Sequence, residues 1–498
     1  MTDKAVTHWI DNKAWDGASE RRGPLFDPAV GRQTGTVDLA GPAEVDQAVA
    51  GAAAAFPAWR DTSLTRRAAV LFSLRELVRS HDRELAQLIT SEHGKVLADA
   101  RGEVARGLEV IEFACGIPHL LKGEHSEEVS TGVDAHSARH PVGVAAGITP
   151  FNFPVMVPLW MAPIALACGN CFVLKPSERD PSASVRLAEL AAEAGVPPGV
   201  LQVVQGDKVA VDALLSHPGI AAVSFVGATP TARHVYEEAA RHGKRVQALG
   251  GAKNHLVVMP DADMDAAAAA AVSSAYGSAG ERCMAVSALV AVGGAGDELV
   301  PRIAERAAGL RVGPGTEPGM DMGPLVTGPH RDRVTSYLEA GVAAGATLAV
   351  DGRGHRVEGD PGGYWLGPCL FDHVTPAMSI YTDEIFGPVL STLRVDTLDD
   401  ALGLLRANPY GNGAAIFTND GRAVRTFERE ADAGMIGVNV PIPVPMAYYS
   451  FGGWKTSLFG DLHVYGADGV AFYTRTKAVV SRFDRGAHQA GLGFPTAT

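Results

Sequence analysis

A cysteine at a predicted helix-to-strand junction is the residue of this sequence best suited to chemistry. Cys283 follows a helical run over 266–276 that ends at Gly277 and Gly280, and it precedes a β-type run over 286–292. An exposed thiol beside Arg282 and two glycines is expected to have its thiolate form favoured, and the thiolate is the nucleophile. The sequence therefore predicts a nucleophile at Cys283, with a packed thiol as the alternative. Apolar flanks place the other cysteines in the core, namely Cys115, Cys168, Cys171 and Cys369.

Polar residues follow several predicted strands, where ligands bind in open α/β sheets. Asn152, in Thr149-Pro-Phe-Asn-Phe-Pro154, could donate a hydrogen bond to a developing oxyanion, or it could be a turn residue satisfied by its own backbone. Lys175 and Glu178 could hold ribose hydroxyls, or they could be a solvated charge pair. Gly227 precedes a helix that begins near Thr229, whose free amides favour a phosphate.

Composition limits the class of protein. A chain of 498 residues is too long for one core, and a net charge of -13 argues against a nucleic-acid partner. Five cysteines make no disulfide framework, and neither a signal segment nor a membrane span is apparent, so a cytoplasmic protein is expected. The pair Cys168 and Cys171 has no second pair at zinc spacing, so no metal is expected.

The elements that must position these residues fall into two α/β regions. Helices are predicted over 43–56, 64–93 and 96–115, with Pro57 and Gly94 as breaks. Strands over 142–148, 171–175, 200–204, 221–226 and 246–249 then alternate with helices over 181–194, 207–216 and 230–242, which predicts an open parallel sheet covered by helices. A second α/β region begins at 254–259, and β-like stretches over 126–139 and 469–480 are expected to pair.

Together these stretches resemble the aldehyde dehydrogenase superfamily over about residues 8–480. The matching motifs, in order, are Pro150–Pro154, Lys175–Glu178, Phe225–Gly227, Gly280–Cys283 and Glu384–Pro388. The resemblance implies Cys283 as the nucleophile, with Asn152 and the Cys283 backbone N–H as oxyanion donors. It also implies an NAD site that involves Phe151, Phe153, Lys175, Glu178, Gly227, Thr229, Glu384 and Phe386.

The resemblance further implies the domain organisation. An NAD-binding domain is expected over 1–122 and 142–252, and a catalytic domain over 253–445. A small β oligomerisation arm is expected over 123–141 and 468–485. A homotetramer, arranged as a dimer of dimers, is the expected assembly.

One departure from most of the superfamily is informative. Most members have a Glu-Leu-Gly-Gly segment whose glutamate activates the deacylating water, but alignment on Lys253-Asn254 places Leu249 at that position. Because leucine cannot accept a proton from water, a thioester on Cys283 would need a better nucleophile, such as a thiol. The local sequences at 251–255, 257–262, 282–285, 439–445 and 472–474 are similar to those of the CoA-acylating methylmalonate-semialdehyde dehydrogenase branch.

The branch implies a substrate that carries a carboxylate as well as an aldehyde. Arg282 and Arg106 suit that carboxylate because guanidinium groups bind carboxylates bidentately, although Arg106 taken alone is an ordinary helix surface charge. The expected reaction is NAD-dependent conversion of methylmalonate or malonate semialdehyde to propionyl-CoA or acetyl-CoA, with coenzyme A as co-substrate. The alternatives are a hydrolytic aldehyde dehydrogenase, with Glu281 as a substitute base, and a non-catalytic protein that keeps the fold.

Overall fold

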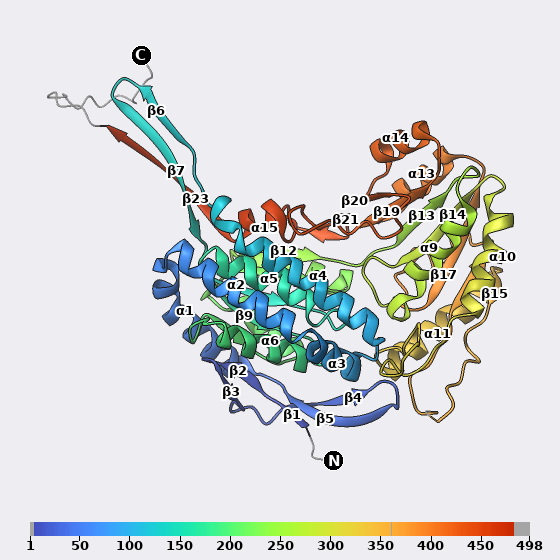
Figure 1. The fold of residues 1–498 in the computed structure, drawn as a ribbon, viewed down its shortest axis with the longest axis horizontal. Coiled ribbons are helices and arrows are strands. Elements are labelled where there is room, and N and C mark those ends of the chain that lie inside the picture. Colours follow the sequence, from blue (N-terminus) through green and yellow to red (C-terminus); the bar gives the residue numbers. More distant parts are fainter. Residues whose placement is uncertain (1–3, 360, 483–498) are drawn as a thin grey trace.

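Two open β-sheets, each with its own helices, form the body of the molecule, and a narrow three-stranded sheet projects from it (Figure 1). The computed structural model describes residues 4–359 and 361–482. The predicted α/β architecture is confirmed, since the central strands of both large sheets are parallel.

The first sheet carries the strand ends that the sequence marks as ligand sites. Its parallel centre is bordered by antiparallel strands at both edges. The order is β22 (Leu458–Phe459), β12 (Arg245–Leu249), β11 (Ile220–Val226), β8 (Val144–Ile148), β9 (Cys171–Lys175), β10 (Leu201–Val203), β2 (His8–Ile10) and β3 (Lys13–Trp15). Every residue of β8 and β9 is buried, as expected for parallel strands covered on both faces.

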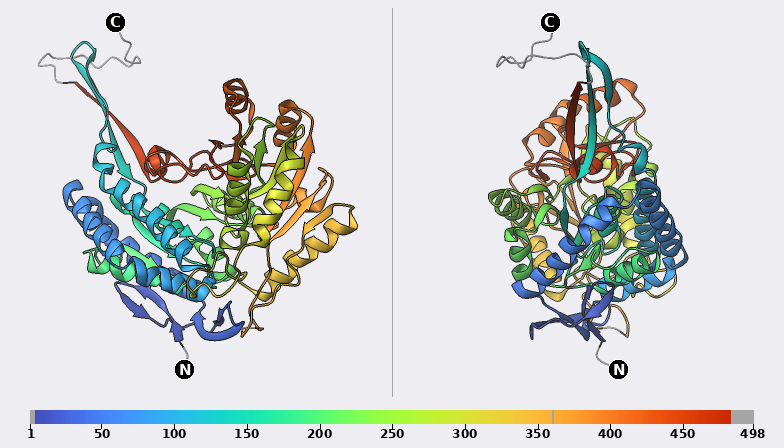
Figure 2. Two further views of the ribbon diagram at one scale, coloured as in Figure 1. Left: turned by 45° about the vertical axis from the view of Figure 1, so that its right-hand side comes forward. Right: turned by 90° about the vertical axis from the view of Figure 1, so that its left-hand side faces the viewer.

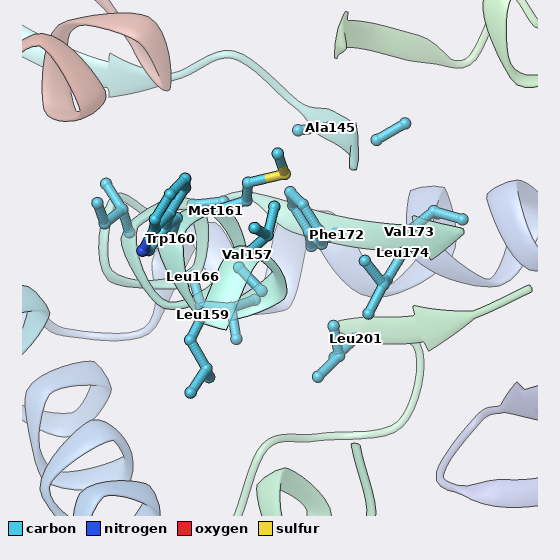
Figure 3. Close-up of a cluster of buried hydrophobic side chains, with 14 of the residues drawn as sticks. Ala145, Val157, Leu159, Trp160, Met161, Leu166, Phe172, Val173, Leu174 and Leu201 are labelled. Carbon is cyan, nitrogen blue, oxygen red and sulfur yellow. The ribbon is translucent and has the colours of Figure 1, made fainter. Parts of the chain in front are cut away.

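Helix α5 (Met156–Ala167) packs against β8 and β9, and all of its residues are buried. Figure 3 shows this cluster, in which Met161 and Phe172 lie close to the strand that carries Ala145. Gly147 is required there, because a Cβ atom would lie 2.5 Å from the Phe172 ring. The other helices of this half are α1 (Pro42–Asp61), α2 (Leu64–Ser80), α3 (Asp82–His93), α4 (Leu97–Cys115), α6 (Ser182–Glu193), α7 (Lys208–Ser216) and α8 (Thr229–Arg241).

Two predicted helix boundaries were wrong. Pro57 does not end the first helix, because α1 continues to Asp61 and its last turn is anchored by buried Trp59, whose indole N–H donates to the Leu166 carbonyl (3.1 Å). The predicted helix over 64–93 is two helices, with His81 between α2 and α3.

The second sheet carries the predicted nucleophile at the start of one of its strands. Its order is β15 (Thr347–Val350), β16 (Cys369–Asp372), β17 (Val389–Val395), β14 (Val286–Val292), β13 (Asn254–Val258), β19 (Gly413–Phe417) and β20 (Met435–Val438). The helices of this half are α9 (Met264–Tyr276), α10 (Ala295–Ala308), α11 (Gly328–Ala343), α12 (Ser379–Thr382), α13 (Leu398–Ala407) and α14 (Gly421–Glu430). Only the edge strand β15 runs antiparallel.

The projecting sheet joins segments far apart in the sequence. Strand β7 (Val133–Pro141) lies between β6 (His125–Ser130) and β23 (Thr474–Arg482), and both views of Figure 2 show the three strands extending away from the body. The predicted pairing is confirmed by the antiparallel register from Thr474 with Pro141 to Arg482 with Val133. However, 469–472 is not strand: it belongs to helix α15 (Gly466–Phe472). Positions 483–485 of the expected arm lie outside the described residues.

Smaller elements complete the chain. Strands β1 (Lys4–Val6), β5 (Arg32–Asp38) and β4 (Arg22–Asp27) form a three-stranded sheet, and β18 (Tyr410–Gly411) pairs with β21 (Trp454–Lys455). Among the described residues, none of the helices combines the length and apolar character needed to cross a bilayer.

Candidate active site

Cys283 lies in a tight turn between α9 and β14. The backbone of Ser278, Ala279 and Gly280 has positive φ angles of 53°, 53° and 72°. At Gly280 a Cβ atom would lie 2.1 Å from the Gly387 carbonyl oxygen, so only glycine fits. The Cys283 carbonyl accepts hydrogen bonds from the side-chain amides of Asn254 (2.9 Å) and Asn412 (3.1 Å), which fix the backbone of the predicted nucleophile.

The expected electrostatic environment of Cys283 was wrong. The thiol is half-buried, and burial, followed by the nearby Glu384 carboxylate, raises its pKa to about 12. The backbone amides of Cys283 and Met284 and the Arg282 charge act in the opposite direction but are outweighed. Arg282 Nη2 instead lies 2.8 Å from Asp99 Oδ1. The free thiol is therefore the favoured form of Cys283 in this structure.

Cys283 lines two sizeable cavities that share it as a lining residue. The larger cavity has a volume of about 510 Å³ and the smaller one about 300 Å³. Seven predicted site residues line the larger cavity, namely Phe151, Asn152, Gly227, Thr229, Cys283, Glu384 and Phe386. Four predicted site residues line the smaller cavity, namely Arg106, Phe153, Arg282 and Cys283. Phe153, which we expected beside a cofactor, therefore lies in the other cavity.

The larger cavity is built at the carboxyl ends of neighbouring strands. Residues 150–152 follow β8, 227–229 follow β11, and 250–251 follow β12, and all of them line the cavity. Helix α8 begins there, and its N-cap residue Ala228 provides no side-chain hydrogen bond, so first-turn amides are not satisfied by a cap. Such a site suits a phosphate group.

Glu384 is held against the glycines that follow β12. Its Oε1 accepts a hydrogen bond from the Ala252 amide (2.9 Å), and burial raises the pKa of the carboxyl to about 7. A Cβ atom on Gly251 would lie 2.2 Å from Glu384 Oε2, so this approach depends on glycine.

Aromatic and basic residues that the sequence analysis missed also line the larger cavity. Phe151 and Phe386, which were predicted, meet edge to face with 5.8 Å between their ring centres. His330, which was not predicted, has its Nε2 2.7 Å from the Phe386 carbonyl oxygen. The Arg179 guanidinium lies 5.0 Å from the centre of the Phe151 ring. Arg333 and Tyr410 are further members of the lining. No local motif marks Arg179, His330, Arg333 or Tyr410, because the fold brings them together from distant segments.

Asn152 is buried and points its amide at the turn that precedes the nucleophile. Its Nδ2 donates to the Glu281 carbonyl (3.0 Å), which uses one of its two hydrogens. The backbone carbonyl of Asn152 accepts a hydrogen bond from Lys95 Nζ. Asn152 and Cys283 therefore line the same cavity with a donor hydrogen of the amide still available.

The smaller cavity has an apolar wall, two arginines, and the carboxylates of Asp99 and Glu103, which pair with Arg282 and Lys95. Arg106 Nη2 donates to the Pro445 carbonyl (2.7 Å), and its Nη1 lies 2.6 Å from Glu109. The apolar lining comes from Phe153, Met156, Trp160, Met284, Ile442, Val444 and Phe451. A small molecule with one carboxylate and a short carbon chain matches this composition.

Lys175 and Glu178 lie outside the linings of both cavities. They form an ion pair at 3.3 Å beyond the end of β9, and burial lowers the pKa of Lys175. The structure thus places the two residues together, as expected from their spacing.

In the part of the chain that the structure describes, each carboxylate that lines the two cavities already has a hydrogen-bond or ion-pair partner. Leu249 is buried in the core at the end of β12. Among the described residues, the carboxylates that line the two cavities are those of Asp99, Glu103, Asp383 and Glu384. Each is engaged: with Arg282 (2.8 Å), Lys95 (2.8 Å), the Tyr337 hydroxyl (2.9 Å) and the Ala252 amide (2.9 Å), respectively.

Glu281, the substitute base considered from the sequence, does not line either cavity. Its fully buried carboxylate accepts a hydrogen bond from the Val326 amide (3.3 Å) and lies 3.5 Å from His330. Burial raises its pKa to about 8. No group of three or more His, Cys, Asp or Glu side chains that could hold a metal ion occurs in residues 4–359 and 361–482.

Known proteins resemble this chain over almost its whole length. The sequence profile of the aldehyde dehydrogenase family matches residues 15–479. Malonate-semialdehyde dehydrogenase of Pseudomonas aeruginosa is 53% identical, with 98% of this chain and 99% of that protein aligned. The crystal structure of methylmalonate-semialdehyde dehydrogenase from Oceanimonas doudoroffii superposes with a TM-score of 0.96 at 52% identity, covering 98% of this chain and 99% of that one.

A structure solved with NAD is equally similar. It is a Sinorhizobium meliloti protein, provisionally assigned as a methylmalonate-semialdehyde dehydrogenase, in complex with NAD. Its TM-score is 0.96 at 52% identity, and 97% of this chain and 99% of that chain are covered.

Proposed function

Because this chain belongs to the aldehyde dehydrogenase family, we propose that it oxidises malonate and methylmalonate semialdehyde with NAD and transfers the acyl group to coenzyme A. The observation that carries this proposal is the position of Cys283, where a cavity built from strand ends meets a cavity with two arginines. One thiol can thus reach a cofactor on one side and a carboxylate-bearing aldehyde on the other.

The larger cavity fits NAD. The uncapped N-terminus of α8 suits the pyrophosphate, and Glu384, which lines the same cavity, would accept hydrogen bonds from the nicotinamide ribose. Glycines at 227 and 251 would allow the backbone to approach the ligand closely, and Phe386 would border the nicotinamide. We assign the adenosine ribose to Lys175 and Glu178, which lie beyond the lining of this cavity at the end of the neighbouring strand β9, so the adenosine would extend out of the cavity. When bound, NAD supplies the acceptor for the hydride of the aldehyde carbon.

The chain's own residues form and stabilise the covalent adduct. Cys283 Sγ, after loss of its proton, attacks the aldehyde carbon from the point where the cavities meet. The Asn152 amide and the Cys283 backbone N–H donate hydrogen bonds to the resulting oxyanion. Oxidation leaves the acyl group as a thioester on Cys283.

The substrate carboxylate belongs to the smaller cavity. Arg106 and Arg282 hold it, while the apolar wall excludes water from the short carbon chain. Loss of this carboxylate as carbon dioxide leaves its electron pair on the carbon beside the thioester carbonyl, where a proton is then taken up. The thiol of coenzyme A then attacks the thioester carbonyl. The acyl group passes to coenzyme A, and Cys283 leaves as a free thiolate.

The hydrolytic alternative lacks a base in the right place. A water attacking the thioester would need a carboxylate near Cys283, but Leu249 is apolar and Glu281 lies outside both cavities. The engaged carboxylates of the linings leave the thiol of coenzyme A as the better nucleophile.

The experiment that tests the function measures NADH with malonate semialdehyde and NAD, with and without coenzyme A, and identifies the product by mass. We expect sustained turnover only with coenzyme A, and acetyl-CoA as the product. Turnover that ignores coenzyme A and yields a free acid would overturn the proposal. An absence of any NADH would favour a non-catalytic protein.

We also infer a homotetramer, arranged as a dimer of dimers, in which the projecting sheet of β6, β7 and β23 joins subunits. The support is exposure: every residue of β6 except Ser130 is exposed, and Val480 on β23 is 70% exposed. A three-stranded ribbon with so little buried surface gains stability from a covering partner.

A further inference from the structure

A buried ion pair fastens the loop that carries Asn152. Lys95 Nζ donates to Glu103 Oε2 (2.8 Å) and to the Asn152 carbonyl (2.5 Å). The Lys95 and Glu103 side chains are 1% and 0% exposed. Since water is excluded, these charge-assisted hydrogen bonds have no solvent competitor.

The same ion pair also holds the residues that follow Asn152 in the chain. Glu103 Oε1 accepts hydrogen bonds from the amides of Val155 (2.8 Å) and Met156 (3.1 Å), where α5 begins. The Lys95 ammonium also lies 4.5 Å from the centre of the Phe153 ring. The backbone at Asn152 and just after it is thus tied to one point.

That point lies where the two halves of the molecule touch. The Leu97 amide donates to the Gly315 carbonyl (3.0 Å), and a Cβ atom on Gly315 would lie 2.4 Å from the Lys95 carbonyl oxygen. Residues around Lys95 therefore pack directly against the half that carries Cys283. The anchored Asn152 reaches the same half through its bond to the Glu281 carbonyl, two residues before the nucleophile.

We propose that Lys95 and Glu103 are positioning residues that hold Asn152 at hydrogen-bond distance from the oxyanion on Cys283. This inference rests on the proposed function, in which Asn152 is the side-chain oxyanion donor. A buried ion pair contributes little net stability compared with a well-packed apolar pair. The ion pair of Lys95 and Glu103 therefore acts by fixing the position of Asn152, and this position matters in the step in which the oxyanion forms.

The test replaces both partners at once, because removing one would leave a buried charge unpaired. In Lys95→Met/Glu103→Met we expect the burst of NADH formed from semialdehyde without coenzyme A to slow by roughly 10- to 100-fold, approaching the loss of one oxyanion donor. The dissociation constant for NAD and the rate of Cys283 alkylation should stay within about twofold of wild type, since no oxyanion forms in either process.

A cycle with Asn152→Ala separates positioning from general structure. If the pair acts through Asn152, removing the pair in the Asn152→Ala background should slow the burst by less than about twofold further. Arg101→Met is the matched control, because it removes an exposed ion pair with Asp82 from the same helix, α4, and should leave the burst rate unchanged.

Two results would overturn the inference: a wild-type burst rate in the double variant, or the same loss in the Asn152→Ala background. If the double variant does not fold, Lys95→Arg keeps the charge but moves the donors, and a full burst rate in that variant would also overturn it. Failure of the proposed function is distinct, because wild type itself would then form no NADH or would keep turning over without coenzyme A.

Discussion

At the scale of single residues, the thiol of Cys283 should lose its proton only at high pH. Because burial raises its pKa to about 12, the thiolate is a minor form at neutral pH and its fraction grows about tenfold per pH unit. We expect the rate of Cys283 alkylation by iodoacetamide, measured by peptide mass without NAD, to rise about tenfold per unit from pH 7 to 9. A plateau below pH 8 would contradict this and restore the favoured thiolate expected from Arg282.

The mass measurement also supplies the control for this titration. Cys115, Cys168, Cys171 and Cys369 are buried, and burial raises the pKa of each thiol to about 11 or 12. Their peptides should remain unmodified in the folded protein while the Cys283 peptide reacts. Cys283→Ala should abolish both the labelled peptide and NADH formation.

Arg106 should discriminate substrates by their carboxylate. Replacement with Met removes a charge-assisted hydrogen bond to the substrate, worth roughly 1.5–3 kcal/mol, so we expect the KM for malonate semialdehyde to rise about 10- to 100-fold. Oxidation of propanal, which has no carboxylate, should change less than about twofold. Equal losses with both aldehydes would show that Arg106 supports the fold through its contact with the Pro445 carbonyl instead.

At the scale of elements, the turn before β14 is expected to tolerate no side chain at Gly280. Alanine there would need a positive φ of 72° and would bring its Cβ to 2.1 Å from the Gly387 carbonyl. We expect Gly280→Ala to lower the kcat for NADH formation by at least about 100-fold, since displacement of a nucleophile by about 1 Å has effects of that size. The matched control is Gly294→Ala, where no atom lies within 4 Å and φ is -79°; comparable activity of the two variants would contradict the prediction.

Local sequence was sufficient where an element is set by its own pattern. The strands Cys171–Lys175 and Val286–Val292 match their predicted ranges, because each is a short apolar run bounded by turn residues. The pattern failed where tertiary contacts decide. Val470 and Phe472 suggest a strand, but helix α15 forms because it packs on α5, where Gly469 would place a Cβ 3.3 Å from Ile164.

The same distinction between local sequence and tertiary contacts applies to the residues of the candidate site. Cys283, Asn152 and Glu384 could be identified because each stands in a local motif. His330 and the pair Lys95–Glu103 could not, because their roles depend on contacts across long sequence separations. Burial is likewise a property of the fold and not of neighbouring letters, which explains the wrong expectation for the thiol of Cys283.

At the scale of the whole molecule, the site exists only where the two large sheets meet. The first half supplies Asn152 and the strand ends of the larger cavity, and the second supplies Cys283 and Glu384. In the proposed function the oxyanion donor Asn152 therefore comes from one half and the nucleophile Cys283 from the other. The contact at Lys95 and Gly315 joins the halves beside the residue that we propose as the oxyanion donor.

The projecting sheet should control assembly without altering the site. Figure 1 places it away from both large sheets, and Val480 on β23 is 70% exposed, which suits burial against another subunit. Val480→Asp would place a charge in that contact, so we expect the mass measured by light scattering to fall from that of a tetramer to that of a smaller species. The control Val209→Asp alters a valine that is 42% exposed on α7, in the body, and should keep the tetramer. An unchanged mass for Val480→Asp would show that the projecting sheet is not an assembly surface, whereas loss of the tetramer with NADH formation retained per chain would separate assembly from catalysis.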